Sequence, residues 1–321
     1  MPRSRRQPPS IPQGRAIVIG ESMADLPADL AHGYTRGPRP RLHYVTVGSG
    51  QPVLLLHGFP DFWYGWRHQI GPLAAAGYRV VAPDQRGYHR SDKPRPVHSY
   101  RINALAGDVL RLADEVAPGQ LLALVGHDWG AAVAWWIALH HPERLTRLVI
   151  INVPHPEVLL ANLRRNPAQM RRSWYVAFFQ LPWLPEWLLG RKGFWGLERV
   201  VRASSHASAF SDADIARYRE AWASPGALTS MLNWYRALIR YPPRPQHSRV
   251  TVPTLILWGA HDVALGRELA EPSCDLCDDG CLVFFEQASH WPHDEEPARV
   301  NSLLLRFLEG GTAAVEKDSI S

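Results

Sequence analysis

The sequence predicts an α/β fold in which a mostly parallel, doubly wound sheet carries an inserted helical lid. Short apolar segments alternate with helical patterns up to residue 153 and again from residue 250, which is the order expected of a parallel sheet. Residues 154–249 lack strand patterns and are rich in Trp, Pro and helical spacing. The stretch Leu121 to Ile137 passes from an apolar strand through a glycine-flanked turn into an Ala-rich helix. We therefore expect a core of residues 31–153 and 250–309, with residues 154–249 as a lid over the carboxyl ends of the strands.

The first 30 residues form a basic arm before this core. Four arginines and no acidic residue precede Glu21, so residues 1–20 account for four of the five formal positive charges. Its Pro- and Arg-rich composition predicts disorder, and it lacks the apolar segment of a secretory signal. The rest of the chain is then close to neutral, which argues against nucleic-acid binding. Residues 310–321 are small and polar and are expected to be a loose tail.

Two further features bear on the compartment. No apolar run reaches the ~18 residues that a membrane-spanning helix needs. Cys274, Cys277 and Cys281 cluster in an acidic segment without an obvious fourth ligand, which favours reduced thiols over a metal site. An odd number of cysteines without a signal peptide is typical of a reducing compartment, so we expect a cytoplasmic protein.

The expected strands are short segments bounded by Gly, Pro or polar turns. The segment PVLLLH at residues 52–57 is a continuous apolar run, the pattern of a strand buried on both faces. It ends in a Gly-Phe-Pro turn that can aim backbone N–H groups into a site. Helical spacing predicts helices over residues 102–116 and 296–308. The remaining strands are expected at residues 32–35, 41–47, 78–82, 121–126, 145–152, 254–258 and 282–286.

The turn Gly126 to Gly130 is predicted to be a nucleophile elbow. Such an elbow has the pattern G-x-S-x-G, but its central residue here is Asp128. A carboxylate attacks an electrophilic sp³ carbon and is left as an alkyl ester, which water must then hydrolyse. The alternative is a turn in which Asp128 only caps the following helix.

Two further residues complete a candidate catalytic triad. Asp128, Asp262 and His290 each follow a predicted strand, in the chain order nucleophile, acid, base. His290 would activate the water, Asp262 would orient the imidazole, and backbone N–H groups of Phe59 and Trp129 would stabilise the oxyanion. The alternatives are that Asp262 caps a helix and that His290 is only one of 15 histidines.

Over residues 32–308 the chain resembles an epoxide hydrolase of the α/β-hydrolase fold. The segments that carry the resemblance are HGFPDFWYGWR, RGYHRSDKP, GHDWGAAVAW, NWYRA, WGAHDVAL and ASHWPHDEEP, with His89 as a departure from the family pattern. The resemblance implies that two lid tyrosines donate protons to the epoxide oxygen while the aspartate opens the ring. Tyr235 and Tyr175 match these positions, and packing within the lid is their alternative role.

The resulting expectation is an enzyme that converts an apolar epoxide to a vicinal diol without a cofactor or metal. Its substrate-binding residues would include Trp129 and the lid aromatics Phe178 and Trp183. One alternative is a haloalkane dehalogenase, which Trp129 would suit as a halide ligand but against which the paired tyrosines argue. Another is a non-catalytic small-molecule binding protein, since a fold does not by itself imply an activity. The apolar surface of the lid has a further alternative role, contact with a membrane or a partner.

Overall fold

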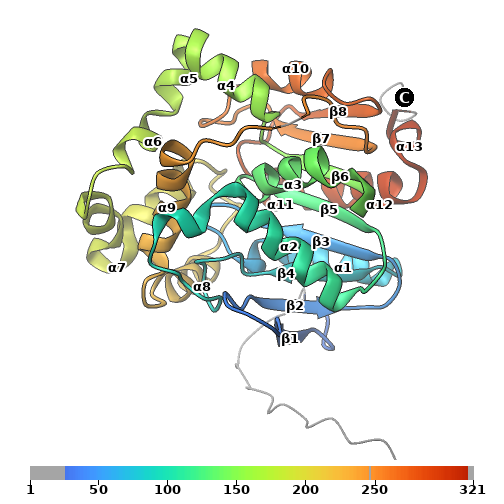
Figure 1. Cartoon of the computed structure of the whole chain (residues 1–321), viewed down its shortest axis with the longest axis horizontal. Helices are drawn as coiled ribbons and strands as arrows, with labels where there is room; N and C mark the ends of the chain where they lie inside the picture. The colour runs from blue at the N-terminus through green and yellow to red at the C-terminus, as the bar shows by residue number, and fades with distance from the viewer. Residues whose placement is uncertain (1–25, 246, 317–321) are drawn as a thin grey trace, which may run out of the picture.

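One mixed sheet forms the centre of the molecule. The computed structural model describes residues 26–245 and 247–316, and within them eight strands form a sheet of order β1-β2-β4-β3-β5-β6-β7-β8 (Figure 1). Strand β2 pairs antiparallel with β1 and with β4, and every other neighbouring pair is parallel. The predicted mostly parallel sheet is therefore confirmed. The strands are β1 Ala31–Tyr34, β2 His43–Val47, β3 Pro52–Leu56, β4 Arg79–Pro83, β5 Leu122–His127, β6 Leu145–Ile151, β7 Thr254–Gly259 and β8 Gly280–Phe285.

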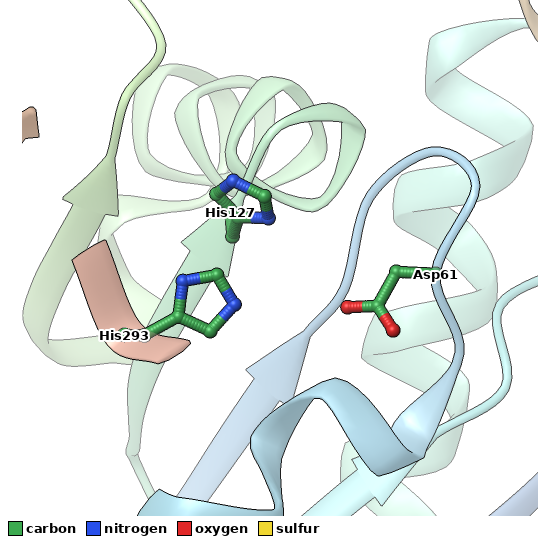
Figure 2. Close-up of side chains that lie close together, drawn as sticks. All are labelled: Asp61, His127 and His293. Atoms are coloured by element: carbon green, nitrogen blue, oxygen red, sulfur yellow. The ribbon is translucent and has the colours of Figure 1, made fainter. Parts of the chain in front are cut away.

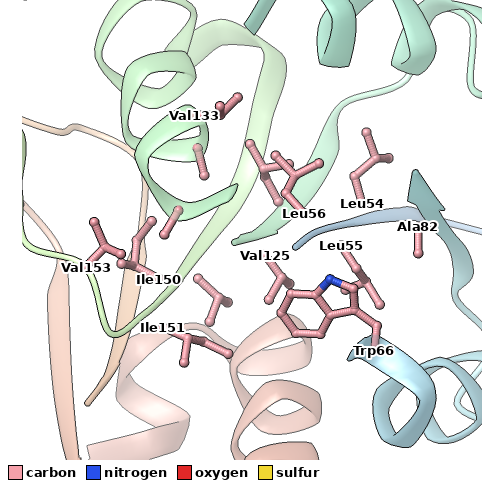
Figure 3. Close-up of a cluster of buried hydrophobic side chains, with 14 of the residues drawn as sticks. Leu54, Leu55, Leu56, Trp66, Ala82, Val125, Val133, Ile150, Ile151 and Val153 are labelled. Carbon is pink, nitrogen blue, oxygen red and sulfur yellow. The ribbon is translucent and has the colours of Figure 1, made fainter. Parts of the chain in front are cut away.

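Helices cover both faces of the sheet, as its central strands require. Every residue of β3 and β5 is buried, and the side chains of Leu54, Val125 and Ile150 lie in one continuous apolar core (Figure 3). Helix α2 packs against α3 on one face, whereas α1 packs against α12 on the other. These helices are α1 Arg67–Ala75, α2 Ile102–Val116, α3 Trp129–His140 and α12 Pro297–Gly310. Helix α2 has the bounds that its apolar spacing predicts.

Six helices and no strand lie between β6 and β7 in the described residues. They are α4 Pro156–Arg165, α5 Pro167–Arg172, α6 Trp174–Phe178, α7 Leu184–Ala203, α8 Asp212–Trp222 and α9 Ala227–Arg240. The indole N–H of Trp234 donates to the Arg86 carbonyl at 3.0 Å, and that of Trp222 donates to the Pro60 carbonyl. Because Pro60 follows β3 and Arg86 follows β4, these bonds hold the helices over the carboxyl ends of the sheet.

The described part of the chain begins at residue 26 and ends at residue 316. The basic arm lies outside the described residues up to residue 25. The segment expected to be a loose tail contains helix α13 (Thr312–Glu316), and residues 317–321 lie outside the described part. Helix α13 forms because Gly311 turns the chain at φ 71° and Val315 becomes buried against the core. The short helices α10 (Ala270–Cys274) and α11 (Pro292–Glu295) complete the second half of the core.

Cys274, Cys277 and Cys281 form no disulfide in the described part of the chain, and burial raises the pKa of Cys277 to about 12. Among the helices of residues 26–245 and 247–316, none combines the length and the apolar character of a membrane span.

Candidate active site

Asp128 occupies a strained turn between β5 and α3. Its φ of 48° and ψ of −123° are unfavourable for a residue with a side chain, and such strain is concentrated at functional sites. Neighbouring backbone crowds the turn: a Cβ on Gly126 would lie 2.6 Å from the Ala131 Cα, and one on Gly130 would lie 2.1 Å from the Leu56 carbonyl oxygen. Both glycines are therefore needed for the turn to form, and the turn presents the Asp128 carboxylate at the carboxyl end of the sheet.

The three residues of the predicted triad lie together. His290, which follows β8, shares a hydrogen bond with Asp262 between Nδ1 and Oδ2 at 2.7 Å. Its other nitrogen, Nε2, lies 3.6 Å from Oδ2 of Asp128. His290 thus bridges two carboxylates that are 134 positions apart in the sequence but adjacent at the edge where parallel strands end.

Mutual interactions set the charge states of this triad. Burial favours the uncharged imidazole, but Asp262 and Asp128 outweigh it and raise the pKa of His290 to about 10. Burial would likewise raise the pKa of Asp128, yet hydrogen bonding and the positive charge of His290 hold it below the ordinary value. The resting site therefore contains an imidazolium between two carboxylates at neutral pH.

The turn after β3 supplies a donor to the nucleophile. The Phe59 N–H donates to Oδ1 of Asp128 at 2.6 Å, so this donor already binds the oxygen that would become the ester carbonyl. Gly58 makes that approach possible, since a Cβ on it would lie 2.2 Å from the Asp128 Cβ. Trp129 directly follows the nucleophile as the first residue of α3, and its N–H stays a prediction as the second donor.

Two phenols from the lid reach this edge of the sheet. The Tyr235 ring, on α9, lies 5.1 Å from that of Trp129 and 5.3 Å from that of Phe59, between centroids. The Tyr175 ring, on α6, is 5.8 Å from that of Tyr235. Burial, followed by the negative charge of Asp128, raises the pKa of both tyrosines, so both stay protonated donors at physiological pH.

The lid aromatics are arranged differently from the expectation. Phe179 is buried, and its ring centroid is 5.7 Å from Phe59 and 4.9 Å from Tyr235. Phe178 packs on Phe179 from the outside, at 5.9 Å. Trp183 is 71% exposed and makes no ring contact with another aromatic residue of the described chain. The structure therefore places Phe179 beside the predicted catalytic residues, whereas Trp183 points to solvent.

Asn152 is a site residue that the sequence reasoning missed. Its side-chain amide donates to Oδ2 of Asp262 at 2.7 Å, and its Oδ1 accepts from the Gly259 N–H at 2.8 Å. It follows β6 with a φ of 53°, a conformation that Asn tolerates better than most residues. A polar residue just past a central strand was the available signal. Asn152 fixes the carboxylate that orients His290.

Buried histidines support the loops that carry these groups. His57 Nδ1 bonds the Gly58 carbonyl and its Nε2 accepts from the Gln85 N–H, each at 3.0 Å, while burial lowers its pKa to about 4. His127 Nε2 donates to the His290 carbonyl at 2.8 Å. Both histidines therefore act as neutral hydrogen-bonding groups that position the turns beside them.

Figure 2 shows that His127 faces Asp61 and His293, which come from the loop after β3 and from α11. The candidate ligand atoms of this buried group lie within 4.8 Å of one another, a donor set of the kind that binds divalent metals. Asp61 is already held at Oδ1 by the Tyr218 hydroxyl and the Phe62 N–H. The bond from Tyr218 therefore ties lid helix α8 to the loop after β3.

Comparison with known proteins agrees with this geometry. A family model described as the alpha/beta hydrolase fold matches residues 51–297. The chain therefore belongs to the α/β-hydrolase family, as the elbow, the strand order and the inserted lid also indicate.

Named relatives narrow the assignment within that family. The chain is 46% identical to the AB hydrolase superfamily protein YfhM of Bacillus subtilis, over 84% of this chain and 94% of that protein. It is 38% identical to epoxide hydrolase 4 of Mus musculus, over 85% of this chain and 77% of that protein. A crystal structure of a mutant epoxide hydrolase from Bacillus megaterium superposes with a TM-score of 0.81 at 30% identity, covering 86% of this chain and all of that chain. Within the α/β-hydrolases, the protein is thus a member of the epoxide hydrolase group.

Proposed function

We propose that the protein hydrolyses an apolar epoxide to a vicinal diol through an alkyl ester on Asp128. The observation that carries this proposal is a carboxylate, in place of a hydroxyl, at the elbow, bonded by the Phe59 N–H and lying 3.6 Å from His290 Nε2. The two lid phenols beside it supply what epoxide opening needs, because the departing alkoxide is a poor leaving group without a proton donor.

In the first step, Oδ2 of Asp128 attacks a ring carbon and the bond from that carbon to the epoxide oxygen breaks. The electron pair of that bond stays on the oxygen, which takes a proton from Tyr235 or Tyr175. The Phe59 N–H holds Oδ1, so Oδ2 is the oxygen left to attack. The product of this step is a hydroxyalkyl ester of Asp128.

In the second step, water attacks the ester carbonyl carbon while His290 takes its proton. This step needs neutral His290, and ester formation favours that state because it removes the Asp128 charge that raises the His290 pKa. The tetrahedral oxyanion forms on Oδ1, where the Phe59 N–H and the Trp129 N–H stabilise it. Collapse of the intermediate breaks the bond between the acyl carbon and the oxygen that carries the alkyl group, and His290 returns its proton to that oxygen as the diol leaves. The proton that remains on the new Asp128 carboxyl group re-forms the phenol that was deprotonated in the first step.

The aromatic surroundings favour an apolar substrate, and the expected partner is that small molecule. Phe179 and Trp129 both contact Tyr235, so the substituent of an epoxide bound at the phenols would lie against indole and phenyl rings. A related Bacillus megaterium enzyme has been crystallised with its product, a naphthyloxy-propane-1,2-diol, which is an aromatic vicinal diol. We accordingly propose aryl-substituted epoxides as the first substrates to test and the cytoplasm as the location.

The test is the intact mass of His290→Gln after incubation with epoxides or with haloalkanes. Without the base the ester should accumulate, so the protein should gain the whole mass of the epoxide. His290→Gln combined with Asp128→Ala is the matched control and should gain nothing.

Two outcomes would contradict the proposal. A gain only from haloalkanes, equal to the alkyl group without halide, would assign a dehalogenase. A ligand that is bound tightly by the unaltered protein and recovered chemically unchanged, with no adduct from either panel, would assign a binding protein.

A further inference from the structure

The lid carries an exposed surface made of tryptophan and arginine side chains. The guanidinium carbon of Arg191 lies 5.0 Å from the ring centroid of Trp187 and 5.9 Å from that of Trp195, and Arg199 covers Trp195 at 5.0 Å. Since one guanidinium contacts both indoles, these four residues form one surface, which we call the α7 patch. Trp187 is 55% exposed and Trp195 is 40% exposed, although Trp is normally a strongly buried residue.

A break in α7 brings the members of this patch together. Residues Arg191 to Phe194 leave the helical conformation, and Lys192, Gly193 and Phe194 have left-handed backbone angles. The break redirects the second half of the helix so that Trp195 meets the same arginine as Trp187. Figure 1 places α7 at the outer edge of the lid, remote from α13. Because Trp187 and Trp195 are both exposed, the α7 patch faces solvent.

The lid as a whole is strongly basic. Residues 154–249 contain fourteen Lys and Arg against six Asp and Glu, an excess of eight positive charges in a chain whose formal net charge is +5. The rest of the chain is therefore at −3. Within the described residues, Arg191, Lys192 and Arg199 are exposed and form no ion pair. Their charges are available to an anionic surface.

We propose that the α7 patch docks the protein on the surface of an anionic lipid bilayer. Indole rings prefer the interface between water and lipid, where one side of the ring is apolar and its N–H stays hydrated. Lys and Arg beside them gain electrostatic attraction from anionic headgroups. Tryptophan next to unpaired Arg and Lys, on a broken helix at the edge of the lid, fits such an interface.

Other occupants of the patch are disfavoured by charge. A second copy that docked through the same face would bring a second lid with the same excess of positive charge against the first. The basic arm of this chain has four arginines and no acidic residue before Glu21, so it too would be repelled. An anionic bilayer is the occupant that complements both the charge and the indoles.

This inference rests on the proposed function for its consequence. An apolar epoxide partitions into the hydrocarbon of a bilayer, so an enzyme docked there by its lid would meet its substrate at a high local concentration. The neighbouring lid helices α6 and α9 carry the two phenols, so docking through α7 would bring the lid edge of the active site close to the bilayer.

The experiment is co-sedimentation of the full chain with phosphatidylglycerol–phosphatidylcholine vesicles and with pure phosphatidylcholine vesicles. We expect binding to the anionic vesicles that weakens as salt is raised. Trp187→Ser with Trp195→Ser, and separately Arg191→Gln with Arg199→Gln, should each lower the partition coefficient at least about tenfold. Tyr34→Ser with Leu121→Ser is the matched control, since both residues are exposed on the core, and it should bind as well as the unaltered chain.

Three results would overturn the inference: no binding of the unaltered chain, equal binding to both vesicle types, or undiminished binding by both patch variants. Turnover of a water-soluble epoxide without vesicles should be the same in all these variants. Loss of vesicle binding with full turnover separates this inference from the proposed function, and absence of turnover with intact binding would contradict only the latter.

Discussion

The core and the lid differ in almost every property that bears on the reaction. The core supplies the ionised groups, Asp128, Asp262 and His290, each fixed by backbone donors or by a buried partner at a strand end. The lid supplies neutral phenols and rings whose positions depend on packing. Of the thirteen large apolar side chains that are exposed in the described residues, ten lie in the lid. Under the proposed mechanism, this difference assigns the covalent chemistry to the core, and proton donation and the surroundings of the substrate to the lid.

The largest expected effect comes from removing the core nucleophile. Asp128→Gly and Asp128→Ala should both lower turnover by at least about 10⁴-fold, because no other group can form the ester. The glycine variant should melt at the higher temperature, since its backbone adopts the φ of 48° without strain. Steady-state assays and thermal melts check both statements. Turnover within a hundredfold of the unaltered enzyme would break the assignment of chemistry to the core.

A smaller effect is expected from the phenols of the lid. Tyr235→Phe should slow ester formation from an epoxide about tenfold or more, because one proton donor to the alkoxide is lost. Single-turnover measurements in the His290→Gln background isolate this step. Tyr175→Phe should act in the same direction, and a haloalkane that reacts with the enzyme serves as the control because halide leaves without a proton. Unchanged epoxide kinetics in Tyr235→Phe would contradict the assignment of proton donation to this lid residue.

The pH dependence of ester formation should move when His290 is removed. His290 holds the pKa of Asp128 below its ordinary value, against the effect of burial. In His290→Gln the Asp128 pKa rises, so the acid limb of ester formation should shift upward by about one to three pH units relative to kcat/KM of the unaltered enzyme. Adduct formation measured by mass between pH 3 and 8 tests this sign. If the acid limb had the same midpoint pH in both proteins, His290 would not set the charge state of Asp128.

The smallest effects distinguish two aromatic residues within the lid. Phe179→Leu should lower kcat/KM for an aryl epoxide about tenfold, because Phe179 lies against Phe59 and Tyr235. Trp183→Ala should change it less than about twofold in the absence of vesicles, because this side chain is mostly in solvent. A larger loss of kcat/KM in Trp183→Ala than in Phe179→Leu would instead support the expectation that Trp183 binds the substrate.

By itself the sequence determined the fold class and the positions of the triad. Parallel strands end at one edge of the sheet, so Asp128, Asp262 and His290 could be placed together from where each predicted strand stops. The helix over residues 102–116 could be predicted equally well, because its apolar residues recur with regular helical spacing. In both cases local pattern and topology were sufficient.

Only the tertiary structure decided which lid side chains meet the site. Helix α6 has five residues, too few for spacing to define a buried face, so Phe179 could not be told from Phe178 or Trp183. The left-handed residues inside α7 abolish helical spacing between Trp187 and Trp195, and only packing joins them through Arg191. Side-chain orientation follows from sequence where the backbone is regular; where the chain is broken or short, long-range contacts determine it.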